Sequence, residues 1–359
     1  MSQSTDHPNP TIGPMVRLRG LPYCALPLGG IGIFPDGTEK NLDDGEQIHP
    51  SRSVKTFITD VLRESSPFID GMGPESGTWA KDNSVGKLLS GQKHIELYKR
   101  VVSAEDINKM TGFSQHPPVN NKETWYARRS LHDNLNVPGT ANWTEFTRDI
   151  KENHARTEEA ISDDVATTQC MRWDTNNLIV DIDSERWNNI TMAVVEMRHK
   201  IGMPLTDRTF PVVLITASPI KSGGNEFLVI SIPIIDFETT PWAQFAKEKN
   251  QVVAVYASIE RVRILPHDEK IEWVMATTSD AKGVVSIFNP VVESTAIPSV
   301  IKKDVSLYMA WVQRQRTQGI QPEQAQEQQR RPSVLVRGAT LFKERLGLLS
   351  RTTEIPPQN

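Results

Sequence analysis

Apolar and polar residues alternate with a period of two through most of the middle of the chain, which is typical of β-strands. The predicted strands are 94–102, 123–133, 166–173, 177–182, 190–200, 209–217, 226–235, 251–265 and 270–279. The tetrapeptide at 266–269 (PHDE) favours a hairpin turn between the last two strands. The segment 227–235 (FLVISIPII) is apolar at odd and even positions alike, so we expect it to be covered on both faces.

Helical spacing of apolar residues occurs in three places. The first is 51–64, and the second is 142–161, where Asn142 is a plausible N-cap with Glu145 in the capping-box position. The third helix runs to about residue 316 and has Pro298 near its start, where proline is tolerated. Too few helices separate the strands for alternating βαβ units. The order therefore predicts an α+β fold in which a curved antiparallel sheet grips the long C-terminal helix.

The chain divides into three parts by composition. Residues 1–90 form a Pro-, Gly- and Asp-rich extension with one predicted helix near 51–64, and residues 91–316 hold the organised domain. Residues 317–359 are a Gln-, Glu- and Pro-rich linker followed by a basic tail. The apolar and basic residues of this tail predict either a weak contact with an anionic membrane surface, or a short helix packed on the domain or a disordered segment without that role.

Composition and motifs exclude several classes of protein. The net charge of −4 gives no sign of nucleic-acid binding, and no run of apolar residues is long enough for a membrane span. No secretory signal is recognisable at the N-terminus, so we expect a cytoplasmic protein. Walker A, G-x-S-x-G, H-E-x-x-H and dinucleotide-binding motifs are all missing from the sequence. We expect no cofactor and no metal.

Seven segments resemble one family in the same order along the chain. They are 125–132 (WYARRSLH), 143–146 (WTEF), 153–154 (NH), 195–200 (VEMRHK), 204–211 (PLTDRTFP), 256–262 (YASIERV) and 272–283 (EWVMATTSDAKG). Together they resemble the mainly fungal family known as domain of unknown function 3074, in the START/Bet v 1-like superfamily. The resemblance runs from about residue 90 to 316. One departure from the family pattern is the segment 283–290 (GVVSIFNP), which is expected at the entrance of the cavity.

The resemblance implies a START-like helix-grip fold, with an apolar cavity that the sheet surrounds and the C-terminal helix closes. START-like domains bind sterols, phospholipids or other apolar molecules, and some relatives in the superfamily cyclise polyketides. The leading hypothesis is therefore a protein that binds a hydrophobic small molecule, which enters when the last helix and its adjoining loop open. Two alternatives stay open: a cofactor-independent cyclase or similar enzyme of fungal polyketide or terpenoid metabolism, and an interaction module without a ligand.

Polar residues recur on one face of several predicted strands. The candidate ligand-binding residues are Tyr126, Arg128, Ser130, His132, Glu196, Arg198, Tyr256, Glu260, Trp273 and Thr277. One interpretation is a polar cluster in an apolar pocket that orients a ligand. In a catalytic version, His132 or Glu196 acts as general base and Arg128 or Arg198 stabilises an oxyanion. The other interpretation is a set of cross-strand ion pairs on the wet face of the sheet. Alternation alone does not tell which face is inward.

His154 lies on the apolar stripe of its predicted helix, and Glu158 follows one turn later. A metal site needs a third and a fourth ligand, which the sequence does not identify. We therefore interpret His154 as a core histidine.

Overall fold

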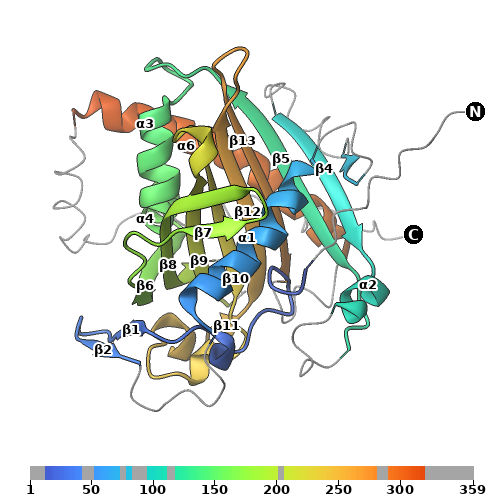
Figure 1. Cartoon of the computed structure of the whole chain (residues 1–359), viewed down its shortest axis with the longest axis vertical. Helices are drawn as coiled ribbons and strands as arrows, with labels where there is room; N and C mark the ends of the chain where they lie inside the picture. Colours follow the sequence, from blue (N-terminus) through green and yellow to red (C-terminus); the bar gives the residue numbers. More distant parts are fainter. Residues whose placement is uncertain are drawn as a thin grey trace, which may run out of the picture.

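The computed structural model describes residues 13–42, 52–72, 78–82, 95–110, 118–200, 206–280 and 290–319. These residues form one curved sheet with the strand order β2-β1-β6-β8-β9-β10-β12-β13-β5-β4-β3, while β7 pairs with β8 and β11 with β9 (Figure 1). Neighbours along this order are antiparallel. The long helix α6 (Pro290–Thr317) packs against β5 and β4. The predicted α+β architecture, a curved antiparallel sheet that grips a C-terminal helix, is confirmed.

Strands β4 to β13 agree closely with the nine predicted ranges. The strand bounds are β1 Gly30–Ile33, β2 Glu39–Asn41, β3 Ala80–Lys81, β4 Ile95–Val102, β5 Glu123–His132, β6 Val165–Trp173, β7 Val180–Ile182, β8 Glu185–His199, β9 Arg208–Pro219, β10 Glu226–Pro233, β11 Val252–Val253, β12 Val255–Ile264 and β13 Ile271–Asp280. Strand β8 begins earlier than predicted, because a register shift between Asn188 and Thr191 interrupts its alternation. The β12–β13 hairpin forms as expected, with Leu265 N donating to the carbonyl oxygen of Lys270.

The helices are α1 Val54–Asp70, α2 Ala104–Lys109, α3 Trp143–Phe146, α4 His154–Ile161 and α6, and a π-helical segment, η2 (Thr147–Glu152), joins α3 to α4. The predicted capping box is present, since Asn142 accepts from the backbone N–H of Glu145 and the Glu145 carboxylate accepts from that of Asn142. The expected position of Pro298 is wrong. Helix α6 begins at Pro290, so Pro298 lies in its interior, where a proline removes one backbone hydrogen bond. Tertiary packing of the helix outweighs this local preference.

Both faces of the sheet are covered, as the doubly apolar strands suggested. Helix α1 lies across one face, which we call the α1 face, and contacts β7 and β12 (Figure 1). Helices α3, α4 and α6 lie on the other, the α6 face. Phe146 and Ile150 there join Val305, Tyr308 and Val312 of α6 in one buried cluster with the sheet. The N-terminal strands β1 and β2 extend the main sheet through the pairing of β1 with β6.

Two expectations concern parts of the chain outside the described residues. The segment 283–289 at the expected cavity entrance and the basic tail beyond residue 319 both lie there. In the described part of the chain, no helix has the length and apolar character needed to span a membrane.

Candidate functional site

The polar side chains of β5 are buried on the α6 face. Arg128, Ser130 and His132 are each at most 5% exposed. Tyr126, on the same face of the strand, packs with Leu97 of β4 and Ile301 of α6. Burial excludes a wet outer face for this stripe, so β5 brings an unusual amount of polar surface into the interior.

Among these residues, Arg128 has the buried side chain with the most hydrogen-bond donors to satisfy. Its guanidinium carbon lies 3.8 Å from the centroid of the Trp273 ring, and its Nη2 is 3.9 Å from Glu260 Oε2. Both Nε and Nη1 are buried without a hydrogen-bond partner. Burial lowers the pKa of Arg128, against the opposing charges of Glu260 and Asp304. An arginine in this state has donors available for a ligand. Each buried donor left without a hydrogen bond costs about 1–3 kcal/mol.

Glu260 links Arg128 to α4. Its Oε2 accepts a 2.8 Å hydrogen bond from Trp273 Nε1, and its Oε1 lies 3.7 Å from His154 Nε2. Three of the candidate residues, from β5, β12 and β13, are thus in contact, and their role in ligand binding stays a prediction. No sequence pattern indicates that His154 joins them, because that contact depends on how α4 lies over the sheet.

His154 is buried at the start of α4. Its Nδ1 lies 3.1 Å from the carbonyl oxygen of Ile150, and its Nε2 lies 3.4 Å from Glu158 Oε1. Burial acts to lower the pKa of His154, but the charges of Glu158 and Glu260 and the Ile150 carbonyl outweigh it and raise the pKa to about 9. The imidazole is therefore protonated at neutral pH.

His132 takes part in aromatic packing and in a hydrogen bond with Ser130. Its Nε2 lies 2.8 Å from Ser130 Oγ, which donates in turn to the Trp273 carbonyl oxygen at 3.3 Å. The His132 ring packs against Phe146, with 5.6 Å between centroids. These contacts fix the ring in the core between α3 and the sheet.

Glu196 and Arg198 lie on the opposite face of the sheet from Arg128. Their neighbours on β8, Val195 and Met197, pack in the cluster on the α6 face, so the residues that alternate with them point the other way. The Glu196 carboxylate accepts from the backbone N–H groups of 244–246, at 3.0, 2.6 and 3.2 Å. It thereby caps a short 3₁₀ helix. The structure does not bring Glu196 together with His132 and Arg128.

The two remaining candidates are satisfied by nearby groups. Thr277 Oγ1 donates to the carbonyl oxygen of Ala257 at 3.1 Å. The Tyr256 hydroxyl lies 3.4 Å from Met197 Sδ, and burial raises the pKa of this phenol well above 10. Both side chains can line a ligand site, but neither provides an acid or a base near neutral pH.

A cleft of about 880 Å³ lies between η2–α4 and the strands β1, β6, β8 and β9. Its lining on the sheet includes Ile31, Ala193, Val195, Leu214 and Thr216, and its lining on the helices runs from Lys151 to Arg156. None of the ten candidate residues lines it. The cleft is nevertheless lined by His154, and the Glu260–Arg128 pair lies behind that side chain. The alternation of residues in the sequence does not indicate this cleft, because the cleft arises where η2 and α4 lie over the sheet.

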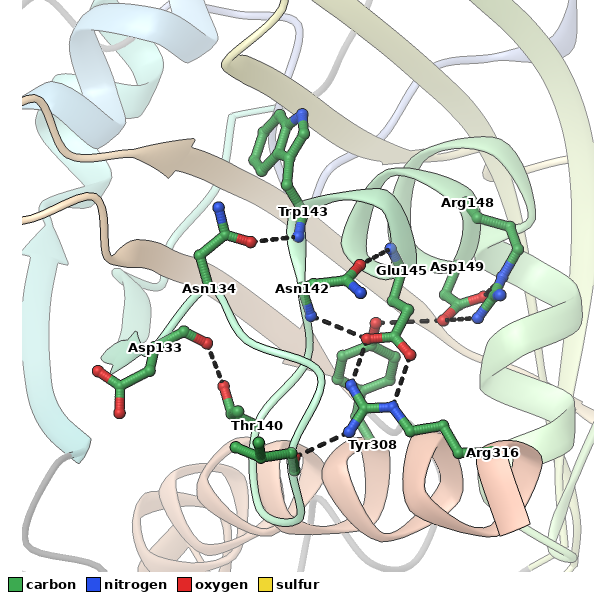
Figure 2. A network of polar contacts seen from close by, with 11 residues as sticks. Asp133, Asn134, Thr140, Asn142, Trp143, Glu145, Arg148, Asp149, Tyr308 and Arg316 are labelled. Atoms are coloured by element: carbon green, nitrogen blue, oxygen red, sulfur yellow. Dashed lines mark hydrogen bonds and ion pairs between the residues drawn. The ribbon is translucent and has the colours of Figure 1, made fainter. Parts of the chain in front are cut away.

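A second polar network, shown in Figure 2, ties the end of α6 to α3 and η2. Arg316 donates through Nε and Nη2 to both oxygens of Glu145, and through Nη1 to the Val137 carbonyl oxygen at 2.8 Å. About two turns earlier on α6, the Tyr308 hydroxyl donates to Asp149 at 3.2 Å. We call these contacts the α6 latch. They hold the helical wall of the cleft against α6.

Comparison with known proteins gives a family and some distant structures. No curated protein matches the chain. Among solved structures, the lipid transfer and protein localization domain of human StarD13 is 11% identical (TM-score 0.39) over 65% of this chain and 88% of that one. Human STARD10 is 13% identical (TM-score 0.43), over 77% and 94%. A STAR-related lipid transfer protein fragment from Xanthomonas axonopodis is 9% identical (TM-score 0.34), over 66% and 99%.

The family assignment rests on a family model. The model described as "Protein of unknown function (DUF3074)" matches residues 125–312, which is just over half of the chain. This range contains the motifs from 125–132 to 272–283, so the resemblance drawn from them is confirmed. The chain belongs to the DUF3074 family.

Proposed function

We propose that the protein binds a hydrophobic small molecule with a polar end group in the cleft between η2–α4 and the α6 face. The observation that carries this proposal is the form of the cleft. Its volume of about 880 Å³ lies within the range of about 300–1,000 Å³ typical of ligand sites. It is also lined by His154, which belongs to a buried charged cluster with Glu260.

The lining mixes apolar side chains on the sheet with many polar ones, which suits a molecule that has both apolar and polar surface. Ile31, Ala193, Val195 and Leu214 offer apolar surface on the sheet. Burial of ligand hydrocarbon against them contributes about 25 cal/mol for each Å² removed from water. The exposed rim residues Glu152 and Arg156 leave the cleft accessible from solvent, so entry does not require α6 to release its latch.

The polar end of the ligand is directed toward the cluster of His154, Glu260 and Arg128. Arg128 has two buried N–H-bearing nitrogens without partners. A carbonyl, hydroxyl or carboxylate group that reaches this cluster receives hydrogen bonds otherwise left unmade.

A cleft-filling variant tests the proposal. Leu214 is buried and lines the cleft, so Leu214→Trp places a large ring in the ligand volume. Ile220→Trp is the matched control, because Ile220 is 38% exposed and does not line the cleft. Anilinonaphthalene sulfonate, which is apolar with one anionic group, is the probe.

We expect saturable fluorescence enhancement with one probe per chain in the wild type and in Ile220→Trp, and its loss in Leu214→Trp. Circular dichroism checks that all three chains fold. Equal binding by the two tryptophan variants would remove the cleft from consideration. Absence of binding by the wild type, to this probe and to a total lipid extract, would favour a ligand-free interaction module.

A further inference from the structure

We propose that His154, Glu158 and Glu260 bind one divalent transition-metal ion, with Zn²⁺ the best fit, beside the cleft that His154 lines. Each residue offers one ligand atom, and the three atoms lie within 4.8 Å of one another. His154 and Glu158 are one turn apart on α4, and Glu260 comes from β12. The fold thus supplies the third ligand that the sequence does not identify.

Two of the three separations among these atoms are close to those of a metal site. His154 Nε2 lies 3.4 Å from Glu158 Oε1 and 3.7 Å from Glu260 Oε1. Direct charged hydrogen bonds are shorter, at about 2.7–2.9 Å. Ligand atoms about 2.0–2.1 Å from a tetrahedral Zn²⁺ are about 3.3 Å apart. Both separations are therefore too long for good hydrogen bonds and close to the edge of a coordination tetrahedron.

The groups behind the ligands orient them in the required way. His154 Nδ1 lies 3.1 Å from the Ile150 carbonyl oxygen, so Nδ1 keeps its N–H, and Nε2, which faces the two carboxylates, is the nitrogen that would give up its proton to bind a metal ion. Metal-binding histidines are commonly held by such a hydrogen bond. Glu260 Oε2 is occupied by Trp273 Nε1, at 2.8 Å, which leaves Oε1 as the ligand atom.

The local backbone aims His154 at the sheet. The π-helical segment η2 precedes α4, and Asn153 N donates to the Arg148 carbonyl oxygen, five residues back. The extra residue in this turn rotates the start of α4 relative to a regular α-helix. Such π turns are frequent at functional sites.

Charge and access leave one coordination position for an outside ligand. Two carboxylates, a neutral imidazole and the nearby Arg128 sum to −1, so a divalent ion brings the cluster to +1. A hydroxide or a carboxylate in the fourth position restores neutrality, and the cleft that reaches His154 gives it a path. Three protein ligands with an open position is the arrangement of reactive zinc sites. This site does not depend on whether the cleft also holds an apolar ligand.

Metal binding to the full chain is the test. After treatment with a chelator and dialysis, the protein is titrated with Zn²⁺ by calorimetry and with Co²⁺ by visible absorption. We expect one ion per chain, a cobalt spectrum typical of four-coordinate sites, and a rise in Tm on adding Zn²⁺.

Glu158→Gln is the main variant, because its carboxylate side chain is 33% exposed and the change leaves its volume almost the same. It should weaken Zn²⁺ binding by about tenfold or more. Glu159→Gln is the matched control, since the neighbouring Glu159 bonds Thr167 instead and should leave binding unchanged. Glu260→Gln should abolish the cobalt spectrum.

Two results would overturn the proposal. The first is no stoichiometric binding by the wild type, which would make the cluster an imidazolium held between two carboxylates. The second is binding that Glu158→Gln and Glu159→Gln reduce equally, which would show surface association only. The apolar probe is titrated separately, so loss of one kind of binding does not imply loss of the other.

Discussion

Arg316 of the α6 latch allows the most detailed prediction. We consider Arg316→Met, which keeps much of the aliphatic volume but removes the guanidinium. The change deletes two hydrogen bonds to Glu145 and one to the Val137 carbonyl oxygen. The side chains of Arg316 and Glu145 are only 16% and 11% exposed, so solvent replaces the lost contacts poorly.

The magnitude lies between two limits. Exposed ion pairs contribute about 0–1 kcal/mol, and removing one partner of a fully buried pair costs about 3–5 kcal/mol. Glu145 keeps one partner, because it still accepts from the backbone N–H of Asn142 at 2.8 Å. We therefore expect Arg316→Met to lower the free energy of unfolding by about 2 kcal/mol.

Urea denaturation followed by circular dichroism measures this loss. Arg314→Met is the control, since Arg314 is exposed two residues earlier on the same helix and should change stability by less than about 0.5 kcal/mol. A double-mutant cycle with Glu145→Gln should give a coupling energy of about 1–2 kcal/mol. Equal effects of the two arginine changes, or no coupling to Glu145, would refute the latch.

Three further predictions follow from other buried groups. Arg128→Met removes the unpartnered donors at nearly constant volume, so we expect it to bind the anionic probe about tenfold more weakly. Its circular dichroism spectrum should still be that of a folded protein. Unchanged affinity would exclude Arg128 from the site. Glu196→Gln should lower the free energy of unfolding by about 2 kcal/mol in urea without changing probe binding, because its carboxylate caps backbone N–H groups on the other face. Burial raises the pKa of Glu64 to about 7, so the folded state holds its proton more tightly than the unfolded state does, and stability should fall as pH rises from about 4.5 to 7. The slope of the free energy of unfolding against pH should not exceed about 1.4 kcal/mol per pH unit, and it should flatten in Glu64→Gln. A slope of opposite sign that Glu64→Gln abolishes would contradict the reasoning.

Local features of the fold were predictable from the sequence. The capping box at Asn142 and Glu145 depends on residues three apart, and the β12–β13 hairpin on four turn residues. The strands showed period-two alternation because each side chain faces one side of a sheet. By contrast, the interior position of Pro298 reflects packing of the whole of α6, which no local preference reports.

The candidate site was predictable only in part. Alternation placed Arg128, Ser130 and His132 on one face, but burial of that face depends on the packing of α6. It also grouped Glu196 with residues that lie on the other side of the sheet, since the relative facing of β5 and β8 follows from sheet register. The approach of His154 to Glu260 requires both the π turn and the position of α4 over β12, and no sequence pattern indicates either.

The central claim is that the cleft at His154 holds a hydrophobic molecule. Native mass spectrometry of the freshly purified full chain, followed by organic extraction, tests it most directly. The account predicts a single added mass at near one-to-one stoichiometry that extracts into organic solvent, and its loss in Leu214→Trp but not in Ile220→Trp. A bare chain that also takes up nothing from a total lipid extract, or an added mass retained in Leu214→Trp, would contradict it.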